Sequence, residues 1–120
     1  MANKKNLTII RGNTQNVSLK VMDAEQASAV QPTDMIYFTA KPKYDDDATD
    51  SSAVIAKTLL AGDVLDQTTG VVTFKLTASD VNIPVGKYVY DIVLRQADYD
   101  RVTLLEGKLT ITPAATLRGF

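Results

Sequence analysis

The stretch "LTASDVNIPVGKYVYDI", residues 76–92, decides the fold because it sets turn chemistry directly before a strong strand pattern. Thr77 and Asp80 have the spacing of a capping box, with Asp in place of the usual Glu, which predicts one capped helical turn. Pro84 blocks continuation of that turn, and Gly86 permits backbone angles that other residues resist. The stretch therefore predicts a tight corner between two strands.

Two tyrosines give this corner the layout of an immunoglobulin-type β-sandwich, in which a loop crosses from one sheet to the other. A Tyr near the start of the later strand can donate its hydroxyl to the loop backbone, so we expect Tyr88 to be buried and bonded near residues 81–84. Tyr90 stands where antibody domains carry their second Cys, but the chain has no Cys. Packing must therefore join the sheets. We interpret Pro84, Gly86, Tyr88 and Tyr90 as a structural corner rather than an active site.

Alternation with a period of two residues extends through nearly the whole chain and is typical of half-buried strands. The clearest segments are "NVSLKVMD" (16–23), "MIYFTAKPK" (35–43), "GVVTFKL" (70–76), "GKYVYDIVLRQ" (86–96) and "RVTLLEGKLTIT" (101–112). No segment predicts a long helix. The pattern predicts an all-β fold, an immunoglobulin-like antiparallel β-sandwich of about seven to eight strands. We expect the sandwich to span residues 1–112 and a C-terminal tail to follow at 113–120.

Two residues inside these segments carry local predictions. Pro42 suggests that the strand before it finishes at a sheet edge, because proline cannot donate to a strand ladder. Gly107 interrupts the alternation of the last strand, which indicates a β-bulge or a close backbone contact at this position.

Composition excludes several classes of function. The length of 120 residues predicts one domain, and the absence of both Cys and His removes disulfides, zinc thiolates and the commonest general base. The 13 basic residues balance 14 acidic ones without a cluster beyond Lys4 and Lys5, so we expect no nucleic-acid partner. The first apolar run covers only residues 7–10, so we expect no signal peptide and no membrane partner.

The carboxylates do not form a convincing catalytic or metal site. Asp45, Asp47 and Thr49 mimic the first oxygen positions of a calcium loop, but the required Gly and the final Glu are missing. We expect a solvated loop, with a weak calcium site as the alternative. Asp98 and Asp100 are expected at a hairpin tip, the wrong place for the raised pKa that a glycosidase acid needs. We therefore predict no enzymatic activity, no cofactor and no metal.

The order of segments resembles small virion structural proteins of tailed bacteriophages, similar to the N-terminal domain of phage baseplate upper proteins. The matching pieces are Arg11-Gly12, Asp23, residues 84–92 and residues 107–113. The connector "DAEQASAVQPTD" departs from that pattern, in which a tighter Asp-Gly turn is more common. The resemblance implies a non-enzymatic structural protein that docks onto tail, baseplate or fibre-attachment proteins.

The resemblance also implies a location and partners. The protein would be made in the host cytoplasm and would reside in the virion, in multiple copies within a symmetric assembly, with other virion structural proteins as neighbours. Open sandwiches have edge strands to which a partner strand can add. The alternatives are a capsid decoration or head-fibre protein and a receptor- or glycan-binding module on a virion or cell surface. For glycan binding, Tyr37, Tyr44 and Tyr99 are the candidate stacking residues.

The last segment, "PAATLRGF", is predicted to leave the sandwich at Pro113, because proline ends the final strand. It holds two large apolar side chains, Leu117 and Phe120. We predict that these bind a pocket on a neighbouring subunit as anchors. The alternative is that the tail folds back onto its own domain.

Overall fold

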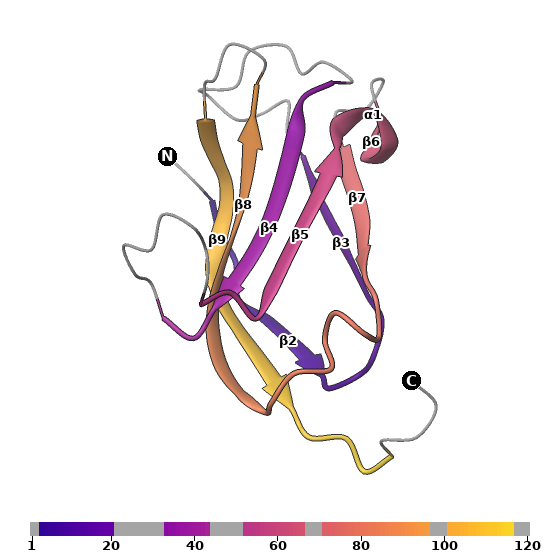
Figure 1. Cartoon of the computed structure of the whole chain (residues 1–120), viewed down its shortest axis with the longest axis vertical. Coiled ribbons are helices and arrows are strands. Elements are labelled where there is room, and N and C mark those ends of the chain that lie inside the picture. The colour runs from indigo at the N-terminus through magenta and orange to yellow at the C-terminus, as the bar shows by residue number, and fades with distance from the viewer. Residues whose placement is uncertain (1–2, 21–32, 44–51, 67–70, 97–100, 117–120) are drawn as a thin grey trace.

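The structure of the chain, a computed structural model, describes residues 3–20, 33–43, 52–66, 71–96 and 101–116 (Figure 1). Within them the chain forms nine strands and one short helix. The elements in chain order are β1 (Asn3–Lys4), β2 (Leu7–Ile10), β3 (Gln15–Lys20), β4 (Met35–Lys41), β5 (Ile55–Leu60), α1 (Ala61–Val64), β6 (Leu65–Asp66), β7 (Val71–Leu76), β8 (Gly86–Arg95) and β9 (Arg101–Thr112). The predicted all-β class is confirmed.

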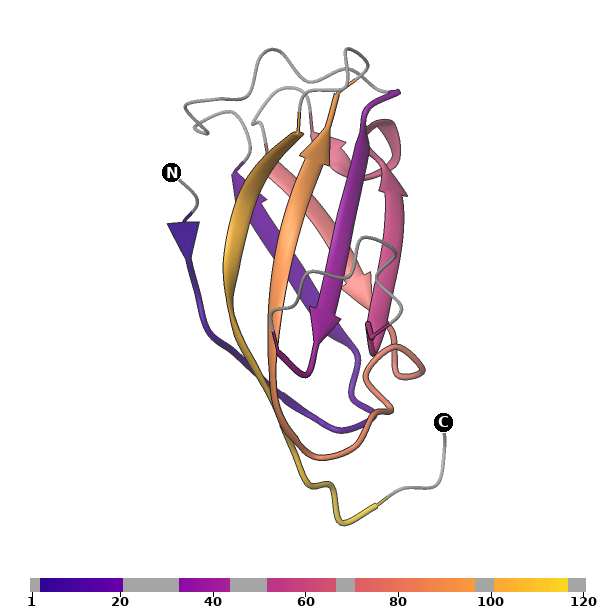
Figure 2. The same cartoon turned by 60° about the vertical axis from the view of Figure 1, so that its left-hand side comes forward.

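The strands form two sheets that lie face to face (Figures 1 and 2). The larger sheet has the order β1-β9-β8-β4-β5, with β2 also paired to β9, and the smaller sheet has the order β3-β7-β6. Every second residue is buried along β4 and along β7. Since alternate residues of a strand point to opposite faces, the buried ones line the space between the sheets. The predicted β-sandwich is therefore confirmed.

One edge of the larger sheet is parallel. Both β1 and β2 pair with β9 in the parallel direction, with Asn3 opposite Leu105 and Leu7 opposite Leu109. In both pairs the numbers of the two opposed residues differ by the same amount. β1 and β2 are therefore two parts of one edge strand. Counted in this way, the described residues form eight strands, and pairing departs from the antiparallel prediction only at this edge. Alternation assigns residues to faces but does not encode strand direction.

The strand that Pro42 assigned to a sheet edge lies in the interior of the sheet. β4 pairs antiparallel with β5 on one side and with β8 on the other. Pro42 follows Lys41, the last residue of the strand, so it ends the ladder without occupying it. The edge prediction is therefore wrong. Among the described residues β5 has β4 as its only neighbour and forms that edge of the sheet.

Aromatic packing joins the two sheets. Phe38 in β4 and Phe74 in β7 meet edge to face, with ring centroids 6.0 Å apart and planes at 67°. Tyr90 in β8 stacks on Phe38 with centroids 5.4 Å apart and planes at 18°. All three side chains are buried, and such pairs contribute about 0.5–1.5 kcal/mol each beyond the burial of their area. Phe38 and Phe74 therefore make the aromatic contact between the sheets, and Tyr90 supports Phe38 from the neighbouring strand of the same sheet.

The last strand contains a β-bulge. The register between β8 and β9 shifts between Ile92 and Val93, which leaves Leu104 as an extra residue in β9. Leu104 and its neighbour Leu105 are consequently both buried, although they are adjacent in a strand. The sequence predicts either a β-bulge or a close backbone contact at Gly107. The bulge lies three residues earlier, and Gly107 itself makes the close backbone contact.

The single helix, α1, is one turn between β5 and β6. Ala61 is fully buried, and its N–H donates to the backbone carbonyl of Asp34 at 2.8 Å, which fixes the turn against the start of β4. No helix in the described part of the chain is long and apolar enough to cross a membrane.

Candidate functional site

The corner between β7 and β8 begins with the capped turn that the sequence predicts. The N–H of Thr77 donates to Oδ2 of Asp80 at 2.8 Å, and the N–H of Asp80 donates to Oγ1 of Thr77 at 3.3 Å. These two bonds are the reciprocal pair of a capping box. The N–H of Val81 donates to the Thr77 carbonyl at 3.2 Å and closes one helical turn. The capping-box prediction is confirmed.

The second half of the corner is held by Tyr88. Its side chain is 8% exposed, and its hydroxyl donates to the backbone carbonyl of Pro84 at 2.6 Å. Gly86 lies between them with φ of 155°, a backbone conformation that residues with a Cβ rarely adopt. The loop is thus folded back onto the strand that follows it, through the hydrogen bond that the sequence predicts.

An ion pair that the sequence did not predict ties the corner to β5. Nζ of Lys57 lies 2.8 Å from Oδ2 of Asp80, and both side chains are about three-quarters buried. Burial is the largest effect on Asp80 and raises its pKa, but the bonds from Lys57 and Thr77 and the lysine charge together lower the pKa below its ordinary value. Lys57 also points inward on an edge strand, an arrangement that opposes addition of a partner strand.

The Arg11-Gly12 turn, which follows β2, lies against this corner. The Arg11 guanidinium donates through Nε to Oδ1 of Asn82 at 3.1 Å, and the Gly12 N–H donates to the carbonyl of Val81 at 3.2 Å. The Arg11 N–H donates to the carbonyl of Thr112, the last residue of β9, at 2.9 Å. The turn, the corner and the end of the last strand therefore meet at one end of the sandwich. We call this the corner end.

Two large apolar side chains are exposed at the corner end. Ile10 is 46% exposed and Val85 is 49% exposed. Ile10 lies opposite Thr112 in the parallel ladder, and Val85 directly precedes the first residue of β8. Both residues therefore flank the point at which the chain leaves the sandwich at Pro113.

A second polar contact lies at the middle of the edge strand. The hydroxyl of Tyr90 donates to the backbone carbonyl of Lys5 at 2.6 Å, and Oδ1 of Asn6 accepts from the N–H of Lys108 at 3.1 Å. A Cβ at Gly107 would overlap the Lys5 carbonyl, so glycine is required here by close backbone approach. These contacts hold the edge strand where its ladder is interrupted. The sequence predicts the close contact but not its partners.

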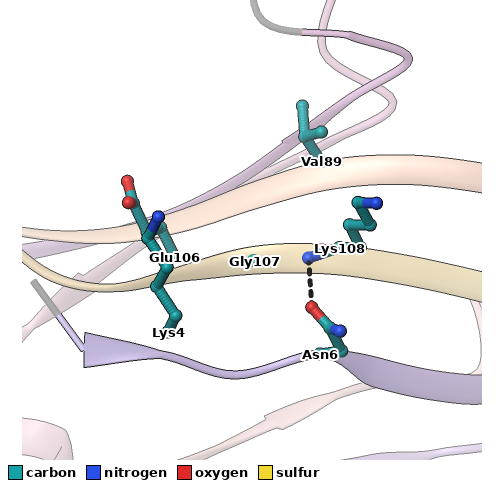
Figure 3. Close-up of a pocket in the computed structure, with 6 residues that line it drawn as sticks. All are labelled: Lys4, Asn6, Val89, Glu106, Gly107 and Lys108. Atoms are coloured by element: carbon teal, nitrogen blue, oxygen red, sulfur yellow. Dashed lines mark hydrogen bonds between the residues drawn. The ribbon is translucent and has the colours of Figure 1, made fainter.

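The surface is hollowed beside this contact, in a groove of about 480 Å³ (Figure 3). The six residues that line it are Lys4, Asn6, Val89, Glu106, Gly107 and Lys108. Two lysines and one glutamate surround a small apolar floor, and the lining has no aromatic side chain. Glycan sites typically stack sugars on aromatic rings, so the groove does not have the character of one.

Several predicted residues lie outside the described part of the chain. They are Asp23, Tyr44, Asp45, Asp47, Thr49, Asp98, Tyr99, Asp100, Leu117 and Phe120. The calcium alternative, the hairpin carboxylates and the tail anchors therefore stay predictions. Tyr37 is described and is half-buried in β4. Among the described residues no group of three or more His, Cys, Asp or Glu side chains could hold a metal ion.

Comparison of the chain with protein-family models and with curated proteins finds no match. The corner combines a hydrogen-bonded turn with the exposed apolar side chains of Ile10 and Val85. Lys57 and Asp80 are bonded to each other, and Asp80, with its lowered pKa, is a poor proton donor near neutral pH.

Proposed function

We propose that this chain is a non-enzymatic structural protein of a tailed-phage virion, a β-sandwich module that docks onto tail, baseplate or fibre-attachment proteins. One observation carries the proposal. Three of the segments that resemble such proteins, separated widely in sequence, meet at the corner end: the Arg11 N–H donates to the carbonyl of Thr112 at 2.9 Å, and Gly86 lies opposite Ile111 in the ladder of β8 with β9. A sequence pattern that gathers at one end of a fold is expected when that end has a shared role.

The corner end has the features of a docking surface. Ile10 and Val85 offer exposed apolar area beside the charged and hydrogen-bonded Arg11. Apolar anchors surrounded by polar groups are typical of protein interfaces. The tail begins here at Pro113, so its anchors Leu117 and Phe120 would extend the same interface onto the neighbouring subunit.

We further infer that the sandwich is of the immunoglobulin-like kind. The strand order β9-β8-β4-β5 against β3-β7-β6 is similar to that of a variable-type domain, in which two extra strands join the sheet of three, and β5 takes the place of the first of them. The Tyr88 bond to Pro84 is a tyrosine corner at the start of the corresponding strand. The edge-to-face pair of Phe38 and Phe74 joins the two sheets without a disulfide.

The composition supports a role without catalysis. The chain has no His and no Cys, which removes the commonest general base and the commonest thiol nucleophile. A glycan- or receptor-binding role remains the alternative, but no aromatic side chain lines the described groove.

Mass spectrometry of purified particles, combined with lysine crosslinking, tests this proposal. We expect the protein in the particles, with crosslinks from Lys87 to a tail or baseplate protein. The variant Ile10→Glu with Val85→Glu should melt normally and fail to enter particles. The matched control is Asn16→Glu with Thr73→Glu, two exposed positions on the smaller sheet, which should enter particles normally. Absence of the unaltered protein from particles would contradict the proposed function.

A further inference from the structure

Three positive charges lie at the corner end or next to it, those of Arg11, Lys87 and Lys108. Arg11 donates through Nε to the neutral side chain of Asn82, and neither lysine makes an ion pair within the described part of the chain. Both lysines are exposed. They are diagonal neighbours in the ladder of β8 with β9, which places their Cα atoms about 7–8 Å apart. Two like charges at this separation repel each other, so a carboxylate from another molecule would stabilise both.

The described carboxylates of the corner and of the adjoining sheet face already have partners. Asp80 is bonded to Lys57. Glu106 lies opposite Lys4 in the ladder of β1 with β9, and Asp91 has an interaction within the chain. These carboxylates therefore leave the charges of the corner end uncompensated, although the whole chain has a net charge of −1.

The guanidinium of Arg11 is held in a fixed orientation. The backbone N–H of this residue donates to the carbonyl of Thr112 at 2.9 Å, and Nε donates to Oδ1 of Asn82 at 3.1 Å. The bond through Nε leaves the two terminal nitrogens, which carry the N–H groups that bind a carboxylate through two parallel hydrogen bonds. A half-buried guanidinium oriented by a neutral partner is preorganised to bind a carboxylate from another molecule.

Apolar side chains lie directly beside these charges. Ile10, which is 46% exposed, precedes Arg11, and Val85, which is 49% exposed, lies two residues before Lys87. We infer that the corner end binds a protein surface on which carboxylates surround an apolar side chain. One carboxylate would bind Arg11, and a second would lie between Lys87 and Lys108. The inference rests on the proposed function and names the chemistry of the partner surface.

A nucleic acid fits this surface less well than a protein does. Nucleic-acid sites typically carry many cations in a stripe, whereas the net charge of this chain is −1, which opposes a long polyanion. Exposed apolar side chains among polar groups are typical of protein interfaces.

Zero-length crosslinking of purified particles tests this chemistry. A carbodiimide joins a lysine amine to a carboxylate only where the two groups are in contact. We expect links from Lys87 or Lys108 to Asp or Glu residues of a neighbouring virion protein. Presence of the protein in the particles without such links would overturn the inference and leave the proposed function standing. Absence of the protein from the particles would overturn both.

The same reagent applied to the dilute free chain tests whether the chain neutralises these cations itself. The acidic stretch at residues 45–50 holds four aspartates. We expect no link from Lys87 or Lys108 to this stretch. Such links in high yield would overturn the inference, because the cations would then have their partner within the chain.

Substitution of the cations tests their part in docking. Arg11→Gln removes the charge and keeps an N–H donor for Asn82, and Lys87→Gln with Lys108→Gln removes the two exposed charges. In assembly beside an equal amount of unaltered chain, each variant should enter particles roughly tenfold less often. The matched control is Arg101→Gln, at an exposed position at the opposite end of β9, which should enter as often as the unaltered chain.

Melting temperatures separate a docking defect from a folding defect. We expect the double lysine variant to melt like the unaltered chain, because both side chains are exposed. It therefore keeps the test open if Arg11→Gln lowers the melting temperature. Entry of the double lysine variant as often as the Arg101→Gln control would overturn the inference.

Discussion

Tyr90 of β8 lies directly opposite Gly107 of β9, and the missing side chain of Gly107 is the space through which the tyrosine reaches the edge strand. The Tyr90 hydroxyl donates to the carbonyl of Lys5 at 2.6 Å, and that carbonyl occupies the position a Cβ at Gly107 would need. One residue thus packs the core through its ring and holds the edge strand through its hydroxyl. The pair links the inter-sheet packing to the parallel edge.

Replacement of Gly107 by Ala should loosen the edge strand. The added Cβ would overlap backbone rather than a flexible side chain, so either Lys5 or Tyr90 must move. We expect a loss of about 1–3 kcal/mol in the free energy of unfolding, the usual cost of overpacking, measured by urea denaturation. The matched control is Gly62→Ala in α1, an exposed helical position, which should be neutral or stabilising by up to about 1 kcal/mol. Equal stability of the two variants would contradict the role of Gly107.

Removal of one hydroxyl should release the edge strand locally. Tyr90→Phe keeps the stack on Phe38 but leaves the Lys5 carbonyl without the hydroxyl. We expect a cost of about 0.5–1.5 kcal/mol and exchange of the Lys5 amide faster by about two- to tenfold, measured by hydrogen exchange. The matched control is Tyr88→Phe, which should cost about the same but leave the Lys5 amide unchanged, since its bond closes the corner. An identical exchange pattern in both variants would show that the two hydroxyls do not stabilise different parts of the fold.

The ion pair at the corner predicts a pH dependence with a definite sign. The pKa of Asp80 lies below its ordinary value in the folded chain, so the unfolded chain binds the proton more tightly. This stabilisation is therefore fully present above the unfolded pKa and is lost as the pH falls through the folded pKa. Asp80→Asn, which can still cap the turn, should cost about 0.2–1 kcal/mol near neutral pH and much less in strong acid.

Urea denaturation between about pH 6 and about pH 2 measures this effect, since that range covers the titration of the carboxyl group. Lys57→Met, which keeps the apolar stem and removes the charge, should lose the same pH-dependent part of the free energy of unfolding. A constant difference between Asp80→Asn and the unaltered chain at every pH would contradict the ion-pair account.

Deletion of residues 113–120 separates two predictions for the tail. If Leu117 and Phe120 dock on a neighbouring subunit, the shortened domain should melt nearly as before and fail to enter particles. If the tail packs on its own domain, the melting temperature should fall by roughly 10 °C, the effect of a few kcal/mol at this size. Normal melting together with normal incorporation would contradict both.

Local chemistry made the corner predictable. Thr77 and Asp80 are three residues apart, and Tyr88 and Pro84 are four apart, so the relevant partners lie within one short stretch of sequence. The alternation of apolar residues likewise predicts which side chains are buried, because burial follows from the geometry of a single strand.

Contacts between distant segments were not predictable in the same way. Lys57 and Asp80 are 23 residues apart, and Lys5 and Tyr90 are 85 apart. No local pattern states which strand will lie beside which, so the parallel pairing of β2 with β9 and the interior position of β4 were also missed. The resemblance to phage proteins does not predict which strands lie side by side, because it rests on turns and strand ends.

The parallel ladder between β2 and β9 has a mechanical consequence. The chain enters the sandwich through β1 and β2 and leaves it through β9, so tension along the chain pulls these two neighbouring strands in opposite directions. Parallel neighbours loaded in this way experience shear, and the hydrogen bonds of the ladder share the force instead of breaking one after another. The hydrogen bond from the Tyr90 hydroxyl to the Lys5 carbonyl also ties this edge strand to the sheet, so it would bear part of the same force. A pulling force along the chain would therefore load the ladder between its first and last strands in shear.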